Sequence, residues 1–160
     1  MEDIVIADLS SLAHAQAVVY LLNEYAKDEM GGGAELSEYA KQNLIHELKK
    51  RQSIYPILAF IEDVPVGLAI CIEGFSSFAC KPLLNIHDIV VAAEYRGQGI
   101  SKKLLAKAEE IATELGCCKL TLEVLEGNKV AQSAYRAYGF EGYELDPTTG
   151  KAMFWQKKLA

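Results

Sequence analysis

The chain has 160 residues, of which 51% are hydrophobic and 24% charged, and its 16 Lys and Arg stand against 22 Asp and Glu for a net charge of −6. This composition is typical of a globular domain with a sizeable core, and it excludes disordered, collagen-like and low-complexity chains. The acidic balance disfavours a nucleic-acid partner, because binding to phosphate backbones depends on clustered Lys and Arg.

Hydrophobic periodicity predicts an alternation of strands and helices along the chain. The first half is expected to form a strand, two helices and an antiparallel strand pair, at residues 4–7, 12–30, 37–51, 54–62 and 66–72. The second half is expected to form a strand, a helix, a strand, a helix and a final hairpin, at residues 86–92, 100–115, 120–125, 129–138 and 139–159. This order predicts one mixed α/β domain over residues 1–160, with a partly antiparallel sheet.

The four cysteines form no C-x-x-C pair, so neither a zinc site nor a redox motif is indicated, and we expect no metal. No apolar run reaches the roughly 18–20 residues that span a membrane. The acidic start of the chain, Met1–Asp3, is unlike a signal peptide. We therefore expect a cytoplasmic protein with reduced thiols and no membrane partner.

The strongest local feature is the sequence R-G-Q-G-I-S at Arg96–Ser101, between a predicted strand and a predicted helix. A glycine-rich turn at this place exposes backbone N–H groups at the helix N-terminus, where anions bind. The dinucleotide pattern G-x-G-x-x-G fails because Lys102 stands at the third glycine, and the nucleoside-triphosphate loop G-x-x-x-x-G-K-[ST] fails as well. From these residues alone, the turn is either a phosphate site or only a tight turn.

Arg96–Ser101 resembles the R/Q-x-x-G-x-G/A pyrophosphate-binding motif of the GNAT superfamily of acyl-CoA-dependent N-acyltransferases, with Ser101 in place of the usual Gly or Ala. A later segment is similar to the superfamily's N-x-x-A-x-x-x-Y-x-x-x-G-F pattern through Asn128, Ala131, Tyr135, Gly139 and Phe140. The resemblance is strong over residues 83–140, and the element order extends it across the chain. It implies the GNAT fold, with a mixed, mostly antiparallel sheet of six to seven strands and helices on both faces.

The resemblance also implies acetyl-CoA as the co-substrate. Backbone N–H groups of the turn, together with the charge of Arg96, would bind its pyrophosphate, through Arg96, Gly97, Gln98, Gly99, Ile100, Ser101 and Lys102. Val91 would pair through its backbone with the pantetheine arm, as an extra strand does, and a main-chain N–H near it would stabilise the oxyanion of the reaction. Asn128 would reach the cofactor, although capping its helix is an adequate role by itself.

The expected reaction is acetyl transfer to a primary amine by direct attack in a ternary complex. Tyr135 would be the general acid for the leaving thiolate, the alternative being that it packs on its helix. Glu123 is the first candidate base, unless it belongs only to a polar strand face, and a water relay without a dedicated base is another option. His87 and Asp88 are further candidates, because two polar residues in an apolar strand need partners. Both could serve one site only if a bulge re-aims the strand.

Recognition of the amine acceptor, a small molecule or a protein, is expected from the two-helix segment and its loops. Tyr25, Met30 and the glycines 31–33 would form a mobile wall of the acceptor site, and Phe75 and Phe78 would line the opposite side. Two other functions stay open: a non-catalytic CoA-binding or regulatory module on the same fold, and a nucleotide-binding protein. A homodimer is common among similar proteins and is compatible with exposed edges of the C-terminal strands.

Overall fold

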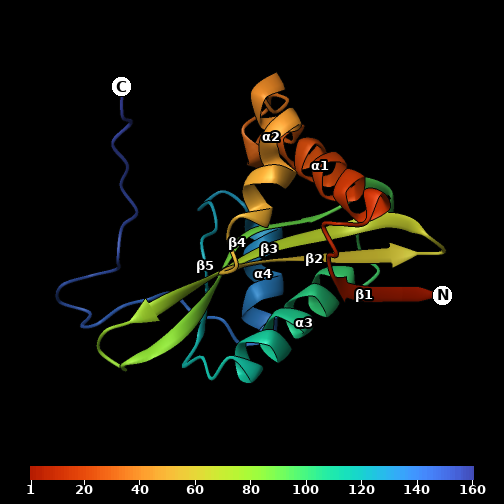
Figure 1. Ribbon diagram of the computed structural model, residues 1–160. Helices are drawn as coiled ribbons and strands as arrows, with labels where there is room; N and C mark the ends of the chain where they lie inside the picture. Colours follow the sequence, from red (N-terminus) through yellow and green to blue (C-terminus); the bar gives the residue numbers. More distant parts are fainter. The chain divides into compact units, whose positions relative to one another are not determined.

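Five strands form one sheet in the computed structural model, which describes residues 1–160 (Figure 1). Their order in the sheet follows the sequence: β1 (Glu2–Ile6), β2 (Ile54–Ile61), β3 (Val64–Ser76), β4 (Lys81–Val91) and β5 (Leu120–Leu122). The first four strands pair antiparallel, whereas β5 joins β4 in parallel. The mixed α/β class and the mostly antiparallel sheet are thereby confirmed.

The chain divides into two compact units, residues 1–125 and residues 126–160, and each is described by itself. The first unit holds the whole sheet and most of the helical residues, in α1 (Leu12–Lys27), η1 (Glu29–Gly31), α2 (Glu38–Lys49), η2 (Ala93–Tyr95) and α3 (Ile100–Glu114). The second unit contains α4 (Lys129–Tyr138). The expectation of a single domain over the whole chain stays a prediction.

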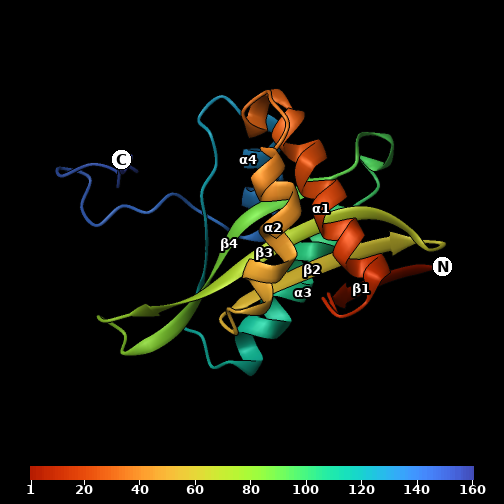
Figure 2. The ribbon, with the colours of Figure 1, turned by 45° about the horizontal axis from the view of Figure 1, so that its top comes forward.

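Helices cover both faces of the sheet in the first unit, as expected. α1 and α2 lie on one face and α3 on the other, an arrangement that Figure 1 and Figure 2 both show. The core beneath α1 and α2 is built from apolar side chains of both helices and three strands: Ala17, Val18, Leu21, Leu48, Leu58, Leu68, Ile70 and Val90. Because both faces of β2 and β3 are covered, these strands are nearly continuous apolar runs rather than alternating ones.

The start of α3 lies unusually close to the sheet at Gly67 on β3. A Cβ atom at Gly67 would lie 3.1 Å from side-chain atoms of both Ile100 and Leu104. The absence of a side chain at this position therefore allows the N-terminal turn of α3 to rest against β3. Ile100 itself is 2% exposed, so the helix start is anchored in the core.

Two elements in the first unit end three residues earlier than the sequence predicted. The helix expected over residues 12–30 ends at Lys27, because Asp28 adopts an extended backbone and begins a short 3-10 turn. The strand expected over residues 120–125 ends at Leu122, so Glu123 lies beyond the sheet. In contrast, β3 and β4 extend further than expected, since they continue as a two-stranded hairpin beyond the rest of the sheet.

The expected final hairpin is reduced to a turn in the second unit. Residues 139–160 contain only an isolated antiparallel bridge between Glu144 and Lys151, closed by a turn around Asp146. The sheet therefore has five strands instead of six or seven. The apolar side chains of this segment, Met153, Phe154 and Trp155 among them, are exposed. A short hairpin that buries no apolar face is marginally stable, which accounts for the missing strands.

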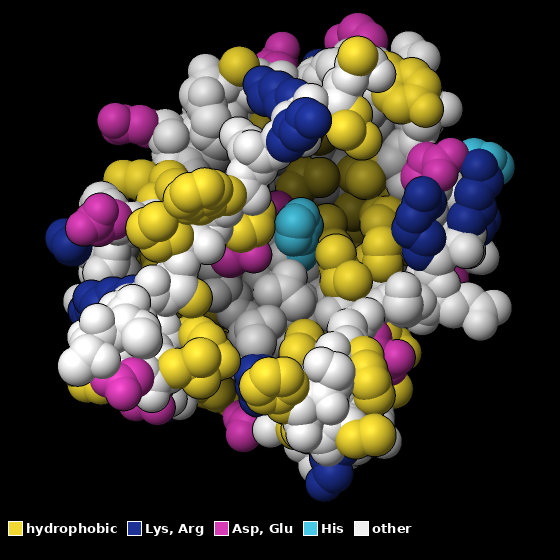
Figure 3. Space-filling model, turned by 90° about the vertical axis from the view of Figure 1, so that its left-hand side faces the viewer, with side chains coloured by type: hydrophobic (Ala, Val, Ile, Leu, Met, Phe, Trp, Pro, Cys, Tyr) yellow, Lys and Arg dark blue, Asp and Glu magenta, His cyan; other side chains and the backbone are white.

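The surface carries charges of both signs. Figure 3 shows Lys and Arg side chains interspersed with Asp and Glu over one face of the molecule, without a continuous basic patch on it. None of the helices combines the length and the apolar character that are needed to cross a membrane.

We predict that Leu21→Ala destabilises the fold by about 2–5 kcal/mol, because Leu21 on the inner face of α1 is fully buried and its truncation leaves a cavity. Leu12→Ala is the matched control on the same helix, where the side chain is 73% exposed and the expected change is within about 0.5 kcal/mol. Urea unfolding of both variants measures the difference, and equal losses would contradict the core assignment.

Candidate active site

The sheet opens between β4 and β5, and this opening is the central feature of the candidate site. The two strands pair over three residues of each, Leu84–Ile86 with Leu120–Leu122. β4 then continues to Val91 while pairing only with β3. The last five residues of β4 thus present one edge of their backbone on the side that β5 has left.

A bulge in β4 lies at the point where the strands part. Ile70 pairs with Asp88 and Cys71 with Ile86, so His87 is the extra residue on β4. Such an insertion reverses which face the following side chains occupy. Accordingly, Val90 packs in the core beneath α1, whereas Ile86 is buried outside that cluster. The bulge that a shared site for His87 and Asp88 requires is present.

The open edge of β4 offers regularly spaced backbone groups. The N–H of Ala92 donates to Val66 O at 2.8 Å, which makes Ala92 a hydrogen-bonded position toward β3. Because antiparallel pairs alternate, Ile89 and Val91 are non-hydrogen-bonded positions, and their N–H and C=O groups point away from β3. An extended ligand could therefore add to this edge as a strand does.

The glycine turn between η2 and α3 is shaped by two left-handed residues. Gly97 has φ 78° and Gly99 has φ 81°, a backbone region that side-chain-bearing residues rarely occupy. Nothing lies within 4 Å of a Cβ built at either position, so the space above the turn is open. Gly97, Gln98 and Gly99 are exposed, while Ile100 behind them is buried. The first N–H groups of α3 face an approachable surface, which suits an anion.

Arg96 is held by two acceptors instead of extending freely into solvent. Its Nε donates to the carbonyl oxygen of Val91 at 3.1 Å, and its Nη2 donates to the carboxylate of Asp28 at 3.3 Å. Arg96 thus connects the glycine turn to the end of β4 and to the segment after α1. No local pattern indicated the partnership with Asp28, since 68 residues separate the two. Only the turn-forming character of an Asp at a helix end could have marked Asp28 in advance.

Three acidic or phenolic groups lie close together where α1 ends beside β4. Burial raises the pKa of the Tyr25 hydroxyl, and the charges of Asp88 and Asp28 raise it further. Burial also raises the pKa of Asp88, against the opposing influence of His87. The pKa of Asp28 is lowered instead, first by the backbone N–H of Met30 and then by Arg96. Tyr25, expected on the acceptor side, therefore neighbours Asp88 on β4.

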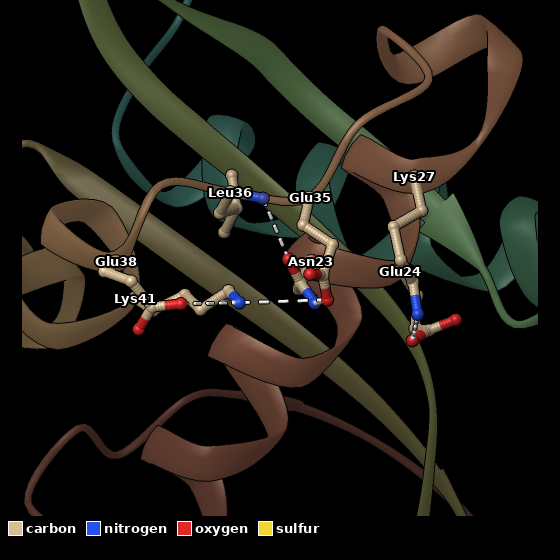
Figure 4. Close-up of polar contacts among 7 residues, drawn as sticks. All are labelled: Asn23, Glu24, Lys27, Glu35, Leu36, Glu38 and Lys41. Carbon is tan, nitrogen blue, oxygen red and sulfur yellow. Dashed lines mark hydrogen bonds and ion pairs between the residues drawn. The ribbon is translucent and has the colours of Figure 1, made fainter.

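The connection between α1 and α2 is tied down by polar contacts (Figure 4). The Asn23 side chain accepts from the N–H of Leu36 at 2.9 Å and donates to Glu35. Lys41 on α2 pairs with Glu35 at 3.8 Å and with Glu38 at 3.3 Å. These contacts hold residues 35–41, which follow the predicted acceptor wall of Tyr25, Met30 and the glycines 31–33.

The other expected acceptor residues have different surroundings. Met30 lies in η1, and a Cβ at Gly31 would lie 1.9 Å from the Tyr25 carbonyl oxygen, so only glycine fits there. Phe75 at the end of β3 and Phe78 in the loop to β4 are exposed, at 65% and 98%. These two side chains lie in the hairpin segment beyond the three β4 residues that pair with β5.

The second unit contains the later motif. Asn128 caps α4, because its Oδ1 accepts from the N–H of Ala131 at 3.2 Å. The Tyr135 ring meets Phe140 edge-on, with centroids 6.1 Å apart, and the carbonyl oxygen of Tyr135 accepts from the N–H groups of Gly139 and Phe140. The motif spacing thus builds a capped helix whose end folds back on itself. The roles of Tyr135 in catalysis and of Asn128 toward the cofactor stay predictions.

Glu123, the first candidate base, does not lie within the sheet. Glu123 is exposed just past the end of β5, and on that strand Thr121 accepts from the Asn85 side chain at 3.0 Å. No group of three or more His, Cys, Asp or Glu side chains is placed to hold a metal ion.

Comparison with known proteins gives a family match and close structural similarity. The family model "Acetyltransferase (GNAT) family" matches residues 18–140. A thialysine N-epsilon-acetyltransferase of Bos taurus is 42% identical over 95 residues, which cover 52% of this chain and 56% of that protein. The matches to the Bos taurus and Sus scrofa enzymes span about half of those relatives' length, 56% and 45%.

Two solved structures have the same fold. A "probable acetyltransferase" has a TM-score of 0.78 and 25% identity, with 98% of this chain and 99% of that chain covered. The enzyme AAC(6')-Iy, in complex with the bisubstrate analogue CoA-S-monomethyl-acetylneamine, has a TM-score of 0.77 and 19% identity, with 99% of both chains covered.

We predict that Asp88→Asn raises the melting temperature at neutral pH. Burial raises the pKa of Asp88 in the folded chain, so its ionised form opposes folding at pH values above that raised pKa. As the pH falls below the ordinary value of 3.8, the carboxyl is protonated in both states and the advantage of the amide disappears. Thermal melts from pH 3 to pH 8 test this, and a benefit that grows toward low pH would contradict it.

Proposed function

Because the chain belongs to the GNAT acetyltransferase family, we propose that the protein is an N-acetyltransferase that transfers the acetyl group of acetyl-CoA to a primary amine. The observation that carries the proposal is the pairing of an exposed glycine turn at the start of α3 with the open backbone edge of β4. The two features lie next to each other in the chain, and Arg96 bonds one to the other.

The chemistry of acetyl-CoA fits these two features. Its pyrophosphate is an anion, and the exposed N–H groups of Gly97–Lys102 at the helix start, assisted by the charge of Arg96, suit that anion. Its pantetheine arm carries amide groups that match the N–H and C=O groups of Ile89 and the N–H group of Val91. A main-chain N–H near Val91 is then the donor for the oxyanion that forms during transfer.

The reaction needs a proton acceptor and a proton donor. The amine nitrogen attacks the thioester carbonyl carbon, the C–S bond breaks, and the products are an amide and the free thiol of CoA. The attacking amine must first lose a proton, since a lysine-like amine has a pKa of about 10.4. Glu123, His87 and Asp88 are the candidate bases, and the raised pKa of Asp88 favours proton acceptance. Tyr135 gives a proton to the leaving sulfur.

The acceptor is an amine that carries positive charge in solution. Asp88 and Asp28 lie beside Tyr25, which supports attraction of a cation to this side of the sheet. The names of similar proteins mention thialysine and an acetylneamine group, both of them amine-bearing small molecules. We assign this chain an amine of the same general class, with Tyr25 and the ordered segment before α2 on its acceptor side.

Location and assembly follow as parts of the same proposal. The four cysteines are free thiols, which supports a reducing compartment such as the cytoplasm. Several large apolar side chains of the C-terminal unit are exposed, which supports self-association into a homodimer. Residues 1–125 and 126–160 would together act as one catalytic domain.

Incubation of the protein with acetyl-CoA and a panel of amines tests the proposal. We expect release of free CoA thiol, detected with a thiol reagent, only when both acetyl-CoA and an accepted amine are present. The panel should include amino acids, polyamines, aminoglycosides and peptides. Saturable binding of acetyl-CoA without any thiol release would instead indicate a non-catalytic CoA-binding module.

Tyr135→Phe tests the proposed general acid. The substitution keeps the ring that meets Phe140, and we expect kcat to fall by about 100-fold while acetyl-CoA affinity stays within about two-fold. Tyr138→Phe, in the same helix and also against Phe140, is the matched control with unchanged turnover. Steady-state kinetics with the best amine of the panel measures both variants. Equal rates for Tyr135→Phe and the wild type would remove Tyr135 as the acid.

A further inference from the structure

Asp28 organises the segment between α1 and α2 through four hydrogen bonds. Its carbonyl oxygen accepts from the N–H groups of Gly31 and Gly33, both at 2.9 Å. One carboxylate oxygen, Oδ1, accepts from the N–H of Met30 at 2.9 Å. The other oxygen, Oδ2, accepts from Arg96 at 3.3 Å. Asp28 is therefore the residue through which this segment is joined to the glycine turn.

Arg96 can hold a further acceptor without releasing Asp28. A guanidinium group carries five N–H donors in a rigid plane, and the bonds to Val91 and Asp28 use two of them. An anion at the adjacent turn can accept from the remaining donors while the first two bonds persist. Such an anion would hold the guanidinium plane at a third point. The bonds of Arg96 to Val91 and Asp28 would then fluctuate less.

We propose that Asp28 is a positioning residue that acts through Arg96, so that binding of CoA at the turn further restrains residues 28–34, the part of the connection that precedes the contacts of Asn23 and Lys41. The inference rests on the proposed function, because CoA is the anion that the turn is assigned. Coupling of this kind gives the enzyme a formed acceptor wall once the acetyl donor is in place. By linkage, an amine that orders the same segment strengthens the binding of CoA by the same factor.

The contact is suited to coupling because it is weak and partly exposed. The side chains of Arg96 and Asp28 are 55% and 33% exposed, so water competes for the bond in the free protein. Exposed ion pairs of this kind change local equilibria by only about two- to five-fold. Because the bond between Arg96 and Asp28 is this weak, a ligand that binds Arg96 can shift the equilibrium between its formed and broken states.

Asp28→Asn breaks the bond to Arg96 and keeps the bond from Met30 that forms the turn. The asparagine oxygen still accepts from the N–H of Met30, but its amide nitrogen cannot accept from Arg96. Glu24→Gln is the matched control, since it removes the same charge near the end of α1 and breaks only the surface pair with Lys27.

Hydrogen exchange of the full-length protein, with and without CoA, measures the coupling at the amides of Met30, Gly31, Gly33 and Ala34. In the wild type and in Glu24→Gln, CoA is expected to slow exchange of these amides by about two- to five-fold. In Asp28→Asn, CoA still binds but the slowing is lost. Equal slowing in Asp28→Asn and the wild type, or CoA binding to the wild type without slowing, overturns the inference.

A second readout in the free protein is independent of CoA. Arg96→Gln and Asp28→Asn should each accelerate exchange of the same amides. Exchange in the double variant should be no faster than in either single variant, because both substitutions break the same bond between Arg96 and Asp28. Multiplicative acceleration in the double variant overturns the link between the two residues. Absence of CoA binding to the wild type, measured by calorimetry, overturns the proposed function, so the two failures are told apart.

Discussion

The candidate site depends on one local constraint, the extra residue that β4 carries at His87. The insertion reverses the alternation of the strand, so that Val90 faces the core beneath α1 while Ile86 is buried elsewhere. At the same point β5 ceases to pair, so the edge of β4 as far as Val91 has no strand paired to it on that side. A regular β4 would have kept Ile86, Asp88 and Val90 on a single face.

The second constraint is the anchoring of α3. Ile100 is buried where Gly67 carries no side chain, so the helix start packs directly against β3. Two glycines with positive φ then allow the chain to turn from β4 into the helix within a few residues. Arg96 closes this arrangement by bonding back to Val91. The turn and the strand edge are consequently linked directly within the first unit.

Two acidic side chains, Asp28 and Asp88, lie where α1 ends beside β4. Tyr25, Asp28 and Asp88 influence one another where α1 ends, and the segment that follows is fastened by Asn23 and Lys41. The protein has a net charge of −6, yet the turn proposed to bind an anion is lined by backbone N–H groups. The carboxyl groups of Asp28 and Asp88 lie instead beside the place proposed for the amine. Under the proposed function, the sign of the local charge, rather than the net charge, would distinguish the two substrates.

The sequence alone determined much of this protein, because its strongest signals are local. The spacing of apolar residues in α3, the glycines of the turn and the Asn128 cap each depend on neighbours within one helical turn, and all three were predicted. The bulge at His87, the early departure of β5, the contact between Arg96 and Asp28 and the loss of the final hairpin were decided by the tertiary structure. Each depends on pairing or burial between segments far apart in the chain, which no periodicity within one segment encodes.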